Sequence, residues 1–296
     1  MTVAHPQSVD APRVDDTGSS RVPGLPHVPD TVPTSRRPAA PLTVTVTPSA
    51  LAAYGQCPLY FQQVYRTQDH SANRAIQRGQ YVHRLADTYT KSVIDGRALS
   101  VDAVLSRVPV PAAYQDGADE ERAILDSGRE ALIGYISWLD AQEFAQIISS
   151  EQYIRTPRRA VRNVPGAEAV FSGRADLMCL DKTGMLVVAD LKATSVAGPD
   201  ELLASPSSWV YRHLAAFAHM VEDIEIVQIV PTTGQSTRAR LGSEQIEAGA
   251  TLVRAMCRAA VEGQYPPTVG QYCSYCDYVD RCPAHSSRPG MTTAVF

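Results

Sequence analysis

Four of the six cysteines lie near the two ends of the chain and constrain the fold more than any other feature. Cys57 stands alone near the front, whereas Cys273, Cys276 and Cys282 follow a C-x2-C-x5-C spacing close to the C-terminus. Cysteines this close in sequence either bind a metal or cluster, or form cross-links. With Cys57 as a fourth ligand, the site would be a clasp that joins the two ends and holds everything between them as one unit.

The composition is that of an ordinary globular protein, with 44% hydrophobic and 20% charged residues in a chain of 296. The net charge of −4 gives no global basic field, although a local basic groove is compatible with it. No apolar run approaches the roughly 20 residues of a membrane span, and the N-terminal segment lacks the apolar core of a signal peptide. We therefore expect a cytoplasmic protein without membrane contact, in which reduced thiols favour ligation over disulfides.

The chain divides into a tail, one large domain and a short end. Residues 1–44 are rich in proline and polar residues without a hydrophobic period, which predicts a disordered tail. Residues 45–285 form the predicted domain, and residues 286–296 a flexible C-terminal tail. Thr47 and Pro48 signal a helix start. Further helices are predicted at 74–94, 119–149, 207–222 and 243–262, and strands at 152–155, 169–180, 185–193 and 224–230. The order predicts an α/β domain with a mixed central sheet.

An acidic hairpin over residues 169–194 is the chemically richest stretch. Asp181-Lys182-Thr183-Gly184 is a turn signal, and placing Gly184 in the left-handed region makes residues 182–184 the loop. Continuing this register places Asp176 opposite Asp190, with Cβ atoms about 5 Å apart. Lys192 is two residues from Asp190, so both side chains share one face of the strand.

An ordinary hairpin without a catalytic role is the alternative interpretation, because isolated D-x-K triplets are common. However, the strand L-V-V-A-D-L is otherwise strongly apolar. A buried charge in such a strand requires a partner or a metal ion. The pair Asp176 and Asp190 therefore favours a cation site.

Four motifs together resemble a known family. Gly173-Arg174-Ala175-Asp176 followed by Asp190-Leu191-Lys192 resembles the paired motifs of the PD-(D/E)XK nuclease superfamily. R-G-Q-Y-V-H at 78–83 resembles the G-x-x-x-H helix of its RecB-like branch, and residues 47–58 resemble the leading cysteine motif of that branch. The C-terminal C-x2-C-x5-C-P completes the pattern of members with an iron–sulfur cluster, such as CRISPR-associated exonucleases of the Cas-four type and phage-borne exonucleases. The resemblance spans residues 47–283.

The resemblance implies a site and a mechanism. It assigns His83, Asp176, Asp190 and the Leu191 carbonyl as metal ligands, and Lys192 as the group that orients or deprotonates the attacking water. Oxygen ligands favour Mg²⁺, and an added imidazole makes Mn²⁺ more competitive. Without the family context, His83 would be interpreted as an ordinary helix histidine.

Residues next to this core have more than one interpretation. The family's Q-L-x-x-Y helix is replaced here by His213-Leu214-Ala215-Ala216-Phe217, so DNA positioning at His213 competes with core packing at Phe217. Glu151 is either an additional carboxylate of the site or, as we prefer from sequence, a charge at a strand edge. Arg174 shares the face of Asp176 and is expected to contact phosphate or a carboxylate. For Tyr211 and Arg212, a DNA groove and a solvated helix face are equally compatible.

The cysteine spacing does not decide the metal, because four cysteines suit Zn²⁺ and a [4Fe–4S] cluster alike. One remote ligand with three clustered ones, together with the resemblance, favours the cluster. Its ligands would be Cys57, Cys273, Cys276 and Cys282. Tyr272, Tyr275 and Tyr278 would shield the cluster or contact single-stranded DNA, and Cys179 and Cys257 are expected in the core.

From sequence we therefore expect a PD-(D/E)XK core with an iron–sulfur clasp and Mg²⁺- or Mn²⁺-dependent DNA cleavage, exonucleolytic on single strands. The alternatives are a structure-selective endonuclease and a non-catalytic, cluster-stapled nucleic-acid-binding module. No G-x-x-x-x-G-K-[ST] loop occurs, so the chain carries no helicase motor of its own. Expected partners are DNA and proteins of recombination, a helicase or CRISPR adaptation.

Overall fold

The computed structural model describes residues 40–67, 74–115, 117–192 and 195–286. The described residues belong to one compact unit, Ala39–Phe296. Most of the expected N-terminal tail, residues 1–39, lies outside the described residues. The expected C-terminal tail also lies outside them from residue 287 onward.

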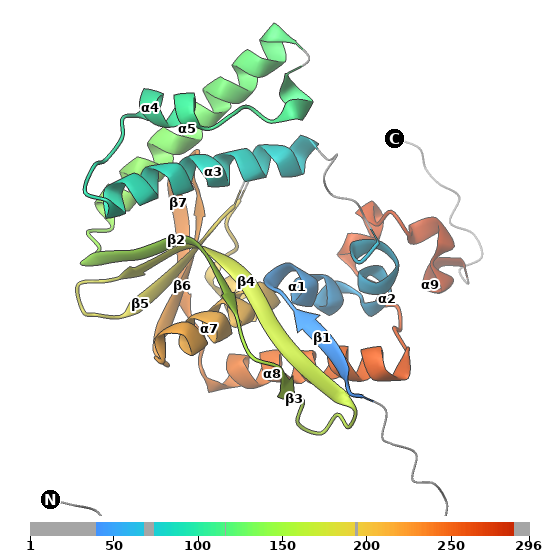
Figure 1. Ribbon diagram of the computed structural model, residues 1–296. Helices are drawn as coiled ribbons and strands as arrows, with labels where there is room; N and C mark the ends of the chain where they lie inside the picture. Colours follow the sequence, from blue (N-terminus) through green and yellow to red (C-terminus); the bar gives the residue numbers. More distant parts are fainter. Residues whose placement is uncertain (1–39, 68–73, 116, 193–194, 287–296) are drawn as a thin grey trace, which may run out of the picture. The chain divides into compact units, whose positions relative to one another are not determined.

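The described residues contain a mixed sheet of seven strands (Figure 1). They are β1 (Leu42–Val46), β2 (Gln146–Arg155), β3 (Arg159–Ala160), β4 (Ala167–Leu180), β5 (Leu186–Leu191), β6 (Ile224–Val230) and β7 (Gln235–Arg240). The order is β1-β4-β5-β6-β7, and β2 and β3 also pair with β4. The β1–β4 and β5–β6 pairs are parallel and the other pairs are antiparallel. The predicted mixed sheet is confirmed, with β4 as the strand that most others contact.

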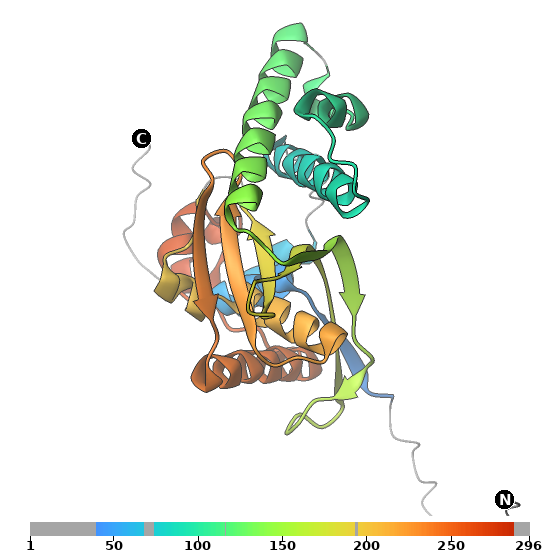
Figure 2. The same cartoon turned by 90° about the vertical axis from the view of Figure 1, so that its left-hand side faces the viewer.

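Helices cover both faces of the sheet (Figures 1 and 2). The described helices are α1 (Pro48–Gln56), α2 (Pro58–Tyr60), α3 (Arg74–Ile94), α4 (Val101–Arg107), α5 (Ala118–Ala141), α6 (Pro199–Ala204), α7 (Pro206–His219), α8 (Ser243–Glu262) and α9 (Pro283–Ser286). A π-helical turn spans Phe61–Tyr65, and 3-10 turns span Ala112–Tyr114, Gln271–Tyr275 and Val279–Arg281. The core of one face gathers α3, α4 and α5, and the core of the other gathers α1, α6, α7 and α8.

Strand β5 is apolar because it lies between the two cores. Leu186 and Val188 lie in one core, whereas Val187 and Ala189 lie in the other. Because both faces are covered, the strand is a continuous apolar run and does not alternate with polar residues. Asp190 interrupts this run and is only 4% exposed.

Local capping signals set several helix ends as predicted. The Thr47 hydroxyl accepts a hydrogen bond from the Ala50 amide at 3.1 Å, and Pro48 is the first residue of α1. Gly263 adopts a left-handed conformation at the end of α8, with φ of 67°. Helix α3 has the predicted bounds.

Two predicted boundaries differ most from the structure. The helix predicted over 119–149 ends at Ala141, and β2 already begins at Gln146. Glu143 has a φ of 49°, which breaks the helix, and pairing of Ile147 with Cys179 on β4 overrides the helical pattern. At the other end, β1 begins at Leu42 inside the expected tail, because its residues pair with β4 from Ala167 onward. Strands β1, β3 and β7 and helices α4 and α6 were not predicted.

Within the described part of the chain, every helix is too short or too polar to cross a membrane.

Candidate active site

The hairpin that joins β4 to β5 has the predicted loop. Gly184 is left-handed with a φ of 86°, and the Asp181 amide donates to the Met185 carbonyl at 3.0 Å. The Asp181 carboxylate accepts hydrogen bonds from the Thr183 amide at 2.8 Å and the Met185 amide at 2.9 Å. These local contacts fix how the two strands face each other.

The resulting register aligns carboxylates on neighbouring strands. Leu177 pairs with Ala189, as the predicted register requires, and the next residues along the two strands are Asp176 and Asp190. On the other side of β4, Ser150 pairs with Leu177, which places Glu151 of β2 next to Asp176. Three acidic residues from three neighbouring strands therefore lie side by side.

Helix α3 brings His83 to the carboxylates of Asp176 and Glu151. The His83 Nδ1 atom lies 3.1 Å from Asp176 Oδ1 and 3.3 Å from Glu151 Oε1. One ligand atom from each of the three residues lies within 4.8 Å of the others, the spacing expected around one metal ion. The preference for Glu151 as a strand-edge charge was therefore wrong. Its φ of 50° turns it out of regular strand geometry at the site.

Asp190 and Lys192 form the second half of the site. The Lys192 ammonium lies 2.6 Å from Asp190 Oδ2, which confirms that the two side chains share one face. The Leu191 amide donates to Asp176 Oδ2 at 2.7 Å and thereby joins the two halves. The ligand role of the Leu191 carbonyl stays a prediction.

The carboxylates of this site favour a positive charge beside them. Burial of the His83 imidazole lowers its pKa, but the hydrogen bonds and charges of Asp176 and Glu151 outweigh burial and raise that pKa to about 10. Burial raises the pKa of Asp176 to about 6, and the charge of Asp190 adds to the increase while His83 opposes it. The carboxylates thus hold a proton on His83 that a divalent cation would replace.

The ligand chemistry fits a hard divalent ion. Carboxylate oxygens and one imidazole suit Mg²⁺ and Mn²⁺. Asp176 and Asp190 are 8% and 4% exposed, so their charges require a cation nearby. A cleft of about 540 Å³ opens over this group, large enough for a nucleotide-sized ligand. It is lined by Ile76, Gly79, Gln80, His83, Arg84, Asp87, Glu151, Arg174 and Asp176.

Helix α7 contributes Tyr211, which sequence reasoning left undecided between a DNA groove and a solvated face. Its hydroxyl donates to Asp190 Oδ1 at 3.3 Å. Burial, and then the charges of Asp190 and Asp176, raise the pKa of Tyr211 well above its ordinary value, so the hydroxyl is a neutral donor. The neighbouring Arg212 instead donates to the Glu222 carbonyl at 2.8 Å.

In the segment that replaces the family motif, His213 packs among aromatic rings and Phe217 lies at the surface, while DNA positioning at His213 stays a prediction. The His213 ring stacks on Trp209 with centroids 5.2 Å apart and lies 4.2 Å from the ring of Phe171. Burial lowers the pKa of His213. Phe217 is 42% exposed, so core packing does not explain it. Arg174 lies beside the site, with Nε 3.6 Å from Glu151 Oε2.

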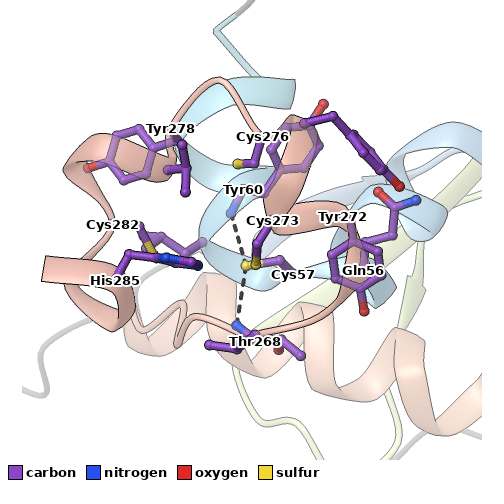
Figure 3. A pocket seen from close by; sticks show the side chains of 14 residues that line it. Gln56, Cys57, Tyr60, Thr268, Tyr272, Cys273, Cys276, Tyr278, Cys282 and His285 are labelled. Carbon is purple, nitrogen blue, oxygen red and sulfur yellow. Dashed lines mark hydrogen bonds between the residues drawn. The ribbon is translucent and has the colours of Figure 1, made fainter. Parts of the chain in front are cut away.

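A second pocket gathers the four expected cysteine ligands (Figure 3). Cys57, the N-cap of α2, accepts hydrogen bonds at its sulfur from the Tyr60 amide at 3.5 Å and the Thr268 amide at 3.3 Å. The Cys273 sulfur accepts one from the Gly270 amide at 3.4 Å. Residues from both ends of the described chain therefore meet here, as the spacing predicted.

Further features of this pocket bear on what it binds. Tyr272, Tyr275 and Tyr278 line it with the cysteines. His285 also lines it, and its buried Nε2 atom has no hydrogen-bond partner among the described residues. Buried polar atoms in native structures usually have a hydrogen-bond partner. Cys179 and Cys257 are buried in the core, as expected.

Fold and site together define an α/β protein with a candidate divalent-metal centre on its sheet. The family model of the PD-(D/E)XK nuclease superfamily matches residues 45–283. The chain therefore belongs to the PD-(D/E)XK nuclease superfamily, whose members are metal-dependent nucleases and use Mg²⁺ or Mn²⁺.

The other comparisons add little. A search of curated proteins finds no match. Among solved structures, the crystal structure of SSO0001 is similar at 18% identity, covering 81% of this chain and 86% of that one, with a TM-score of 0.39. The family assignment therefore rests on the family model.

Proposed function

We propose that the protein cleaves DNA by metal-dependent phosphodiester hydrolysis, as an exonuclease on single strands. The observation that carries this proposal is the close grouping of His83, Glu151 and Asp176. The Asp190–Lys192 ion pair adjoins this group, because the Leu191 amide donates to Asp176. Within the family's fold, this set combines a cation site with an adjacent ammonium. A non-catalytic binding module would have no need for that combination.

Each residue has a proposed task. Asp176, Asp190, His83 and the Leu191 carbonyl would hold the ion, with Glu151 as an additional carboxylate. When bound, Mg²⁺ or Mn²⁺ lowers the pKa of water and neutralises phosphate charge. As an ammonium, Lys192 would orient the attacking water and offset charge on the phosphate. As a neutral amine, it would instead accept the proton of that water. Arg174, which is 61% exposed at the cleft, would contact the DNA backbone.

The test is cleavage of labelled single-stranded DNA with Mn²⁺ by the wild-type protein and Asp190→Asn. We expect the variant to lose cleavage by at least about 100-fold, since the metal site loses a charged ligand. Asp119→Asn is the matched control. The Asp119 side chain is 99% exposed on α5, so this variant should keep full activity. Equal cleavage by wild type and Asp190→Asn would refute the assignment.

Substrate topology separates the exonuclease from its nearest alternative. An exonuclease requires a free end, so covalently closed circular single strands should survive while linear strands are degraded. Cleavage of circles or of branched junctions would instead favour a structure-selective endonuclease. DNA binding without any cleavage would favour the binding module.

We also propose that Cys57, Cys273, Cys276 and Cys282 hold a [4Fe–4S] cluster. All four cysteines line one pocket, and three clustered ligands with one remote ligand favour the cluster over Zn²⁺. Amide hydrogen bonds to the sulfurs of Cys57 and Cys273 suit anionic thiolates. Iron and zinc analysis with a visible absorption spectrum is the test, and colourless protein with one zinc would refute the cluster.

A further inference from the structure

Asp190 is held from two directions by groups that come from different parts of the fold. Lys192 lies 2.6 Å from Oδ2, immediately after β5. Tyr211 on α7 donates to Oδ1 at 3.3 Å. One partner per oxygen leaves little freedom for the carboxylate to rotate about its last side-chain bond.

The contact depends on how α7 packs. Val210 and Leu214, which flank Tyr211 along the helix, are 0% and 2% exposed and dock α7 in the core. They anchor the helix without any help from the tyrosine hydroxyl. The hydroxyl is therefore available for a task at the site, and among the described residues Asp190 is its hydrogen-bond partner.

From this arrangement we infer that Tyr211 is a positioning residue, which holds the Asp190 carboxylate in the orientation that binds the metal ion. The inference rests on the proposed function only in that it requires metal binding at the site. Without Tyr211, the strongest remaining partner of Asp190 is the Lys192 ammonium, which would draw both oxygens toward itself. Asp190 would then turn away from the metal, and Lys192 would be withdrawn from the attacking water.

The experiment compares Mn²⁺ affinity of the wild-type protein and Tyr211→Phe by calorimetry, and the Mn²⁺ concentration that half-saturates cleavage of linear single-stranded DNA. The substitution removes only the hydroxyl and keeps the buried ring. Loss of a residue that orients a metal ligand typically weakens metal affinity about 10- to 100-fold. We expect that shift in both measurements, with cleavage recovering toward the wild-type rate at saturating Mn²⁺.

Tyr135→Phe is the matched control for loss of a buried tyrosine hydroxyl. Tyr135 is 1% exposed, and its hydroxyl lies 2.8 Å from the Thr90 hydroxyl, on the α3–α5 side of the sheet. This variant should lose thermal stability but keep wild-type Mn²⁺ affinity. Unchanged Mn²⁺ affinity in Tyr211→Phe, or an equal shift in Tyr135→Phe, would overturn the positioning role.

The two proposals fail in different ways. A wild-type protein that binds Mn²⁺ without cutting DNA would overturn the proposed function, while weaker binding by Tyr211→Phe would still support the positioning role. A wild-type protein that binds no Mn²⁺ would overturn both.

Discussion

Gly79 provides the sharpest test of how the cleft works. Among the glycines within the described α-helices, Gly55, Gly128, Gly134 and Gly249 are each packed so closely that an added Cβ would lie 3.2 Å or less from a neighbouring atom. Gly79 is different, because nothing lies within 4 Å of the position its Cβ would take. Packing therefore does not require glycine here, although glycine in a helix costs stability.

The position of Gly79 suggests a role in substrate access to the cleft. It lines the cleft over the candidate metal site, one helical turn before His83. We predict that its missing side chain leaves room for the DNA backbone to approach the ion.

The substitution Gly79→Ala should therefore raise stability and lower activity together. Alanine is favoured over glycine in a helix interior by about 1 kcal/mol, which corresponds to an increase in melting temperature of about 2–4 °C. A methyl group in the path of the substrate would displace the scissile phosphate by a fraction of an ångström to about 1 Å, which can lower the rate about 10- to 100-fold.

Thermal unfolding and cleavage of linear single-stranded DNA measure the two effects. Gly128→Ala on α5 is the control. The added Cβ would lie 2.6 Å from the Tyr81 ring, so this substitution should destabilise the protein while leaving the cleft open. A Gly79→Ala variant that is more stable and fully active would refute the clearance role. If Gly79→Ala were less stable than the wild-type protein, the space around the Cβ position would not be open.

Three further outcomes follow from the structure. Apparent Mn²⁺ affinity should rise as pH increases from about 6.5 toward 10, because His83 must lose the proton that its raised pKa retains; calorimetry in buffers of different ionisation heat would detect proton release, and a flat pH profile would contradict this. Cys57→Ala should lose bound iron, whereas Cys257→Ala, in the core, should keep it, as iron analysis would show. Gly184→Ala should lower the free energy of unfolding by about 1 kcal/mol, because its φ of 86° disfavours a side chain; an unchanged denaturant midpoint would argue against it.

The sequence alone determined the features that depend on local chemistry. The hairpin register followed from Gly184 and the turn around it, and the shared face of Asp190 and Lys192 followed from strand alternation. Helix starts such as that at Thr47 followed from capping. In each case the deciding atoms lie within a few residues of one another, so neighbouring sequence contains the information.

Only the tertiary structure decided the features that depend on distant partners. The run after Ala141 became a strand because β4 was there to pair with it. Glu151 became part of the candidate metal site because that strand placed it beside Asp176 and within 3.3 Å of His83. Tyr211 reached Asp190 because α7 docks on the sheet through its apolar neighbours. The physical reason is that burial and long-range pairing outweigh the weak local preferences of a strand edge or a helix face.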